Sequence, residues 1–371
     1  MAEEKDLSIK ISVGICFALV MILGLVFNGI LFLVYNKRKQ LRHPTKLFLV
    51  SLAVVDFVSV ICWTSFSTIS AFIGEWILPT HICQLQEFAM SFCLLLNMHT
   101  FMVLALERCL FLLKPSHHSE MCIDAVIIIL LLSIWLFDGI ISIFPFVGWG
   151  EISYFENQFQ CSMDYEKNTR QMRFATAISL GIPFLVMLVA YIMIFIKLRK
   201  LKRSVSGGGQ IILEQADGAN GDSYGARLKR QQLKFQNAGM KSKKPVLGRE
   251  VDQDGYVRDN SSDEETKVSK TDKSKVQNIF YLYKSDVTLI KTYIMVTVVF
   301  LLLWLPYVIV TYILTYDRYH GIPDAIFYLV VILTHCTSFV KPLIYVIQNE
   351  NFRGHLQKAF KKDEYRDFVR N

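Results

Sequence analysis

Seven long apolar runs constrain the fold of this chain more than any other feature of its sequence. They cover residues 11–35, 46–72, 84–112, 122–146, 172–197, 288–315 and 323–347. Because a bilayer core takes roughly 20 apolar residues per helical crossing, each run is long enough to span a membrane. Hydrophobic residues make up 53% of the chain, above the share typical of soluble domains. We therefore expect an all-α membrane protein, a seven-transmembrane helix bundle.

The positions of the basic residues predict the orientation of the bundle. Clusters of Lys and Arg follow the first and the fifth runs, whereas the connection 73–81 contains neither residue type. Basic loops stay on the cytoplasmic side of a membrane. The N-terminus is therefore expected outside the cell, in a multi-pass protein of the plasma membrane. The net charge of +8 then reflects membrane topology and does not predict nucleic-acid binding.

The remaining segments complete the expected organisation. Residues 1–10 form a short extracellular N-terminus, 11–199 carry spans one to five, and 286–348 carry spans six and seven. Residues 200–285 lose the apolar pattern and are expected to be a disordered cytoplasmic loop. In 349–371, apolar residues four apart among basic ones predict a short amphipathic helix on the inner leaflet, followed by a cytoplasmic tail.

Cysteine usage points to one disulfide. Six of the eight cysteines lie in or at the ends of the runs, which leaves Cys83 and Cys161 in segments expected outside. An oxidising exterior favours joining these two. There is no paired His cluster and no His-Glu-x-x-His motif, so we expect no metal site, no cofactor and no catalytic residues.

A charged pair marks the inner end of the third run. Cys83 and Arg108 are 25 positions apart, which in a helix corresponds to roughly 37 Å, slightly more than the hydrocarbon thickness. Arg108 is expected to bond to Glu107, and to Asp286 at the start of the sixth run, because a buried charge is costly without a partner. The alternative is that Arg108 extends to the membrane surface.

Single residues in every run resemble the marks of the rhodopsin-like (class A) G-protein-coupled receptors. Asn28 and Asp56 look like the inner polar pair of that family, and Glu107-Arg108-Cys109 looks like its Asp/Glu-Arg-Tyr triplet. The other matching marks are Trp135, Pro183, Tyr191, Phe300, Trp304, Pro306 and the Pro342-Leu343-Ile344-Tyr345 end of the seventh-span motif. The resemblance covers all seven runs and leaves only the termini and the long loop outside it.

The resemblance implies a receptor that opens the inner end of the sixth span to engage a heterotrimeric G protein. In that family Trp304 and Phe300 would shift near the Pro306 bend, and Arg108, Tyr191 and Tyr345 would rearrange to receive the G protein. It also implies arrestin, receptor kinases and membrane lipid as partners. We place the chain loosely near the opsin, amine and melatonin branches, as an orphan whose signal is a ligand or its own basal activity.

Lys341 departs from the family pattern, which has Asn or Asp before Pro342. A buried lysine beside Asp56 would bring an ammonium to the place where such receptors commonly hold sodium. Since each charge is costly alone, we expect an Asp56–Lys341 ion pair with Asn97 beside it. The alternative is that Lys341 points into the cytoplasmic cavity.

Other departures concern the ligand. Met90 stands where amine receptors have Asp, and His335 stands where opsins attach retinal through Lys, so no Schiff base can form. The pocket expected by register is lined by Met90, Leu94, Ala175, Ser179, Trp304, Tyr307, Thr311, Val331 and His335. It is mostly apolar, which is compatible with an uncharged or lipid-like ligand, an entering peptide, or none.

Two polar residues inside the runs have no role in the family pattern. His99 and Asp138 are expected either to bond to each other or to be satisfied separately by backbone carbonyls. A competing class for the whole chain is a seven-span channel or transporter, but the two halves show no internal repeat.

Overall fold

The computed structural model describes residues 2–37, 45–114, 117–118, 121–148, 150–164, 167, 174, 176–206, 261–317 and 321–348. Within these residues, seven helical stretches are long and apolar enough to cross a membrane. The expected seven-helix bundle is therefore confirmed. Helix α1 (Ala2–Lys37) packs against α3 and α12, and α4 (Thr80–Leu113) packs against α2, α6 and α8 at the centre of the bundle.

The second crossing is built from three helical pieces. Helix α2 (Thr45–Ser59) continues through a π-helical turn, η1 (Val60–Thr64), into α3 (Ser65–Ile73). Gly74 ends α3 at φ 89°, a left-handed conformation that glycine adopts at little cost, and its N–H bonds to the Ser70 carbonyl. The π turn places both Trp63 and Thr64 in the interior.

The remaining crossings are α6 (Asp124–Ile143) with a 3-10 turn (Phe144–Val147), α8 (Ile182–Ser206) preceded by a π-helical turn (Ala177–Gly181), α11 (Ser261–Asp317) and α12 (Asp324–Gln348). Pro306 lies inside α11 and Pro342 inside α12. A proline frees a carbonyl of the preceding turn and so weakens the helix locally. Large apolar side chains such as Leu136, Leu185 and Leu329 are exposed around the outside, as expected of a lipid-facing surface.

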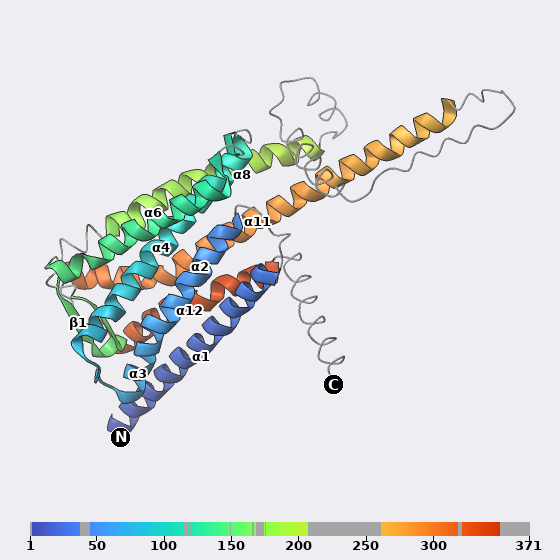
Figure 1. Ribbon diagram of the computed structural model, residues 1–371. Coiled ribbons are helices and arrows are strands. Elements are labelled where there is room, and N and C mark those ends of the chain that lie inside the picture. Colours follow the sequence, from blue (N-terminus) through green and yellow to red (C-terminus); the bar gives the residue numbers. More distant parts are fainter. Residues whose placement is uncertain are drawn as a thin grey trace, which may run out of the picture.

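A short hairpin closes one end of the bundle. Strand β1 (Ile152–Phe155) pairs antiparallel with β2 (Gln160–Met163), and the turn η3 (Glu156–Gln158) joins them. The hairpin lies at the same end of the bundle as the N-terminus of α1 (Figure 1). We call this the hairpin end and the opposite one the Arg108 end.

Helix α11 differs from the expected organisation. It begins at Ser261, inside the range 200–285 that the sequence analysis assigned to a disordered loop, and its first turns project beyond the bundle (Figure 1). Residues 261–285 contain neither Pro nor Gly and include five Lys, a residue that favours helix. Positions 207–260 and the predicted amphipathic helix of 349–371 lie outside the described residues.

Candidate functional site

At the Arg108 end, a buried carboxylate holds the arginine. Nε of Arg108 lies 2.5 Å from Oε2 of Glu107, and its Nη2 lies 2.8 Å from Oε1. Both side chains are at most 5% exposed, so the charges compensate each other away from water. Nε2 of His118 lies 2.5 Å from the same Oε1. The sequence analysis missed His118, which follows the end of α4 in a segment with no motif.

Aromatic rings surround Arg108. Its guanidinium lies 5.2 Å from the ring centre of Phe111 and 5.9 Å from that of Tyr293, which belongs to α11. Tyr293 in turn contacts Tyr345 of α12 edge to face. Tyr191 of α8 shares a 2.9 Å hydrogen bond with Thr297 of α11. Arg108, Tyr191 and Tyr345 therefore each contact a side chain of α11. The side chain of Asp286 lies outside the described ones.

The middle of the bundle holds the expected ion pair. Nζ of Lys341 lies 2.5 Å from Oδ1 of Asp56 and 2.5 Å from Oδ1 of Asn97. All three side chains are less than 5% exposed. Lys341 therefore turns toward the interior and not into a cavity at the Arg108 end, because burial of Asp56 requires a nearby cation.

The rest of the inner polar group links the first two crossings to α12. Asn28 donates from Nδ2 to the carbonyls of Gly24, at 2.8 Å, and of Ser338, at 2.7 Å. The hydroxyls of Ser59 and Ser338 are 3.3 Å apart. Sequence reasoning identified Asn28 but neither serine, since isolated serines in apolar runs carry no distinguishing signal.

Aromatic contacts connect the ion pair with the proposed switch residues. The Lys341 ammonium lies 5.6 Å from the ring centre of Phe300, which packs against Phe101 and Trp304. Trp304 contacts Trp63, whose ring lies 4.0 Å from that of His335. A shift of the Phe300 ring would therefore change the packing around both Lys341 and His335.

His335 occupies a closed environment. Its Nδ1 lies 2.9 Å from the Thr64 hydroxyl, and its ring packs against Trp63 and Phe17. Met90, Tyr307 and Thr311 of the expected pocket are also buried, and Leu94 is partly buried; the Ser179 side chain lies outside the described ones. The described side chains of this set are thus interior, and the hydroxyl of Tyr307 lies 3.4 Å from that of Ser162 in β2. That the set forms a ligand pocket stays a prediction.

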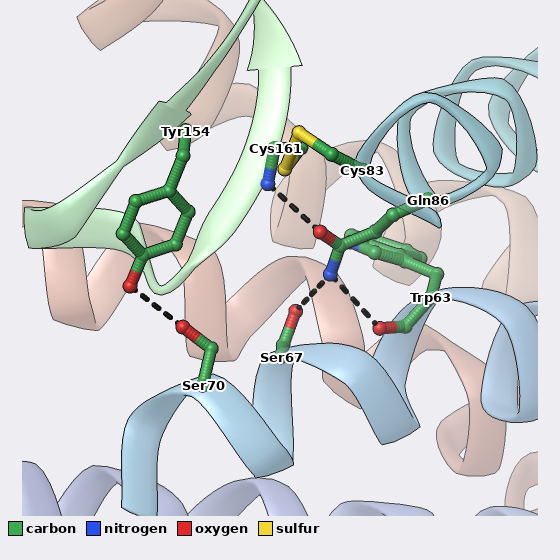
Figure 2. The surroundings of a disulfide bond; sticks show 7 residues. All are labelled: Trp63, Ser67, Ser70, Cys83, Gln86, Tyr154 and Cys161. Atoms are coloured by element: carbon green, nitrogen blue, oxygen red, sulfur yellow. Dashed lines mark hydrogen bonds between the residues drawn. A yellow bond between two sulfur atoms is a disulfide. The ribbon is translucent and has the colours of Figure 1, made fainter. Parts of the chain in front are cut away.

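The hairpin is bonded to residues of this interior. The Cys83–Cys161 disulfide, confirmed here, ties β2 to the start of α4. Gln86 accepts from the Cys161 N–H at 2.8 Å and donates to Ser67 and to the Trp63 carbonyl (Figure 2). Gln160, fully buried, accepts from the Trp63 indole N–H at 2.9 Å. The disulfide and these hydrogen bonds therefore hold β2 against the ends of the second and third crossings.

His99 and Asp138 are brought together. Nδ1 of His99 lies 2.8 Å from Oδ1 of Asp138, and the aspartate is completely buried between α4 and α6. The two side chains are therefore in contact, as in the first of the two expected arrangements, although the geometry between them is not that of a hydrogen bond. Trp135, one turn earlier in α6, donates to the Ser51 hydroxyl at 3.0 Å and anchors α6 on α2.

Seven membrane-spanning helices, a buried arginine–carboxylate pair at one end and a disulfide-linked hairpin at the other define a seven-helix receptor fold. The model of the rhodopsin family of seven-transmembrane receptors matches residues 27–345. The chain therefore belongs to this family.

Several of the curated relatives that it matches are opsins. A Gq-coupled rhodopsin of Mizuhopecten yessoensis is 23% identical over 351 residues, which cover 93% of this chain and 58% of that protein. A rhodopsin of Loligo forbesii is 26% identical over 44% of this chain and 36% of its own length. The matched segments thus span less than two thirds of these relatives. Among solved structures, squid rhodopsin shares the fold with a TM-score of 0.69 at 20% identity, over 96% of this chain and 86% of that one.

Proposed function

We propose that this chain is a plasma-membrane receptor that activates a heterotrimeric G protein from its Arg108 end. In this orientation the N-terminus and the hairpin face outside and Arg108 faces the cytosol. The observation that carries the proposal is the buried Arg108–Glu107 pair beside Tyr293 of α11. Such a pair is stable while α11 stays packed and becomes available when α11 moves away.

The contacts of α11 support an activation route. Pro306 weakens the helix next to Trp304, so the part of α11 nearer Arg108 can swing without disturbing the other half. That swing separates Tyr293 from Arg108 and Thr297 from Tyr191. The guanidinium and the two phenols of Tyr191 and Tyr345 then face a cavity of the size of a helix end. No bond is made or broken, and we assign no catalytic residue.

Gq is the G-protein subtype that we propose first, because the relative from Mizuhopecten yessoensis bears that description. Arrestin and receptor kinases are proposed as further partners on the resemblance alone. The signal is either a small uncharged ligand or the basal activity of the chain. The buried His335, packed on Trp63, offers no amine for a retinal Schiff base.

The test is basal second-messenger production in cells that express the full chain without added ligand. We expect raised inositol phosphate, abolished by Arg108→Ala and unchanged by Lys167→Ala, which removes an exposed cation at the hairpin end. Cyclic AMP measured in parallel assigns the subtype: a rise indicates the stimulatory G protein, and a reduced forskolin response the inhibitory one. Guanine-nucleotide exchange on purified G proteins then gives the same answer without cells.

A second measurement must distinguish the receptor from a channel or transporter. Purified chain in lipid vesicles should leave ion gradients intact, because charged groups in the interior are buried in pairs, Asp56 with Lys341 and Glu107 with Arg108. Steady ion flux together with silent G proteins would overturn the proposal.

A further inference from the structure

Next to the Arg108–Glu107 pair, one cluster combines three kinds of metal-binding side chain. A carboxylate oxygen of Glu107, a ring nitrogen of His118 and the sulfur of Cys122 all lie within 4.8 Å of one another. Carboxylate, imidazole and thiolate are the three ligand types that zinc takes in proteins. We propose that this cluster binds Zn²⁺ and thereby ties the segment after α4 to the end of that helix.

The backbone already holds two of the ligands on one face. The N–H of Cys122 bonds to the carbonyl of His118 at 2.9 Å, and the N–H of His118 bonds to the carbonyl of Lys114 at 3.0 Å. Residues four apart in such a turn point the same way. His118 and Cys122 therefore project together toward Glu107, which lies in the last turns of α4.

The distances need only a small adjustment. In a tetrahedral site with metal bonds of 2.0–2.3 Å, ligand atoms lie about 3.3–3.6 Å apart. Glu107 Oε1 and His118 Nε2 are now 2.5 Å apart, at hydrogen-bond distance. The metal ion would replace the proton between them and move them apart by roughly 1 Å, while the Cys122 sulfur moves inward.

Neighbouring groups orient the ligands in the way that metal sites require. Arg108 holds both carboxylate oxygens of Glu107, Oε2 through Nε and Oε1 through Nη2, and in this orientation Oε1 also lies 2.5 Å from Nε2 of His118. The rings of His118 and Phe111 pack edge to face, with their centres 5.2 Å apart. Support of this kind fixes ligand rotamers before the metal arrives.

Access and the charge of the ligands also suit a dication. Zn²⁺, the carboxylate of Glu107 and the thiolate of Cys122 sum to zero, so the site itself is neutral, and the Arg108 cation keeps its hydrogen bonds to Glu107 and its contacts with the rings of Phe111 and Tyr293. His118 is 2% exposed, but Cys122 is partly exposed and not in a disulfide, and gives a route of entry. The sequence analysis expected no metal site because the chain has no paired His cluster and no His-Glu-x-x-His motif, and these three ligands are separated in the sequence.

The experiment measures zinc in the purified full chain, carrying an affinity tag free of His and Cys, after dialysis against a weak chelator. We expect about one ion per chain, the stoichiometry of one three-ligand site. His118→Ala and Cys122→Ser should each lose it. His117→Ala, which removes the exposed neighbouring imidazole, should retain it. Equal zinc in all four proteins, or none in the wild type, would overturn the proposal.

Two further readouts keep the test independent of folding defects and of G-protein activity. His118→Cys retains a ligand and should still bind, with a preference shifted toward softer cadmium. Cobalt added in place of zinc should give a thiolate charge-transfer band in the wild type that is absent in Cys122→Ser. Zinc should raise the Tm of the wild type by a few degrees, whereas an unchanged Tm, or an equal rise in Cys122→Ser, would contradict the assignment.

Discussion

The ammonium of Lys341 lies 2.5 Å from a carboxylate oxygen of Asp56, and this contact joins α12 to α2 in the middle of the bundle. Asn97 of α4 accepts from the same ammonium, so three crossings meet at one charge. We infer that Lys341 serves as a built-in cation at the place where related receptors are expected to hold sodium.

Replacing this cation should make the protein sensitive to sodium. Lys341→Asn leaves Asp56 buried without a partner, which should cost about 3–5 kcal/mol in the free energy of unfolding. Sodium should restore part of the lost stability. The measurement is whether the Tm is higher in sodium chloride than in N-methylglucamine chloride at equal ionic strength. The wild type and Lys291→Asn, an exposed lysine of α11, should show no sodium effect. A sodium-dependent wild type with an indifferent Lys341→Asn would refute the built-in cation.

The His99–Asp138 contact should give a measurable coupling in the free energy of unfolding. Truncation of His99 to Ala leaves a completely buried carboxylate without its imidazole, and we expect a loss of about 1–3 kcal/mol. Asp138→Ala in the His99→Ala background should cost less than it does alone. A double-mutant cycle by thermal or denaturant unfolding should give a coupling of about 0.5–3 kcal/mol. Additive effects would mean that the two groups do not interact.

Gln86 should stabilise the hairpin substantially, although its side chain carries no charge. Gln86→Leu removes the acceptor for the Cys161 N–H and the donor to Ser67, and unpaired buried polar groups should cost about 1–3 kcal/mol. Gln86→Glu keeps the acceptor and should cost less if the Cys161 contact dominates. Hydrogen exchange at the β2 amides reports the hairpin directly, and unchanged protection in Gln86→Leu would contradict this role.

Tyr154 gives the hairpin end a dependence on alkaline pH. Burial raises the pKa of Tyr154 above its ordinary value, partly opposed by its 2.6 Å hydrogen bond to Ser70. The folded state thus holds the phenolic proton more tightly than the unfolded state does. The resulting stability is fully present below the ordinary pKa of about 10 and is lost as pH rises through the folded value. Tyr154→Phe should flatten the fall in Tm above that pH, and an unchanged fall would exclude Tyr154 as its source.

The sequence predicted most of this architecture because a membrane leaves few choices. An apolar run of sufficient length has to be a helix, since backbone groups cannot be satisfied by lipid. The Asp56–Lys341 pair was predictable because the family resemblance puts Lys341 beside Asp56, and two buried charges each need a partner. The disulfide followed from the compartment that the topology gave to its cysteines.

What the sequence could not supply are contacts that depend on the exact rotation of a helix or on the path of a loop. His118 meets Glu107 only because the segment after α4 turns back on the helix. Gln86 reaches Cys161 and Ser67 because α3, α4 and β2 converge at the hairpin end. Neither residue belongs to a motif, and an isolated His or Gln has no periodic pattern that would single it out.

The π turn Val60–Thr64 also affects how this chain should be aligned with other proteins. A π turn holds one more residue than the α-helical turn it replaces, and each residue of a helix advances by about 100°. Deleting one residue there would rotate everything beyond it, so that Ser67 and Ser70 no longer face Gln86 and Tyr154. An ungapped alignment with a relative that lacks the turn would therefore pair lipid-facing positions with interior ones along α3. Any homology-based assignment of ligand contacts in this crossing depends on placing a single-residue gap correctly.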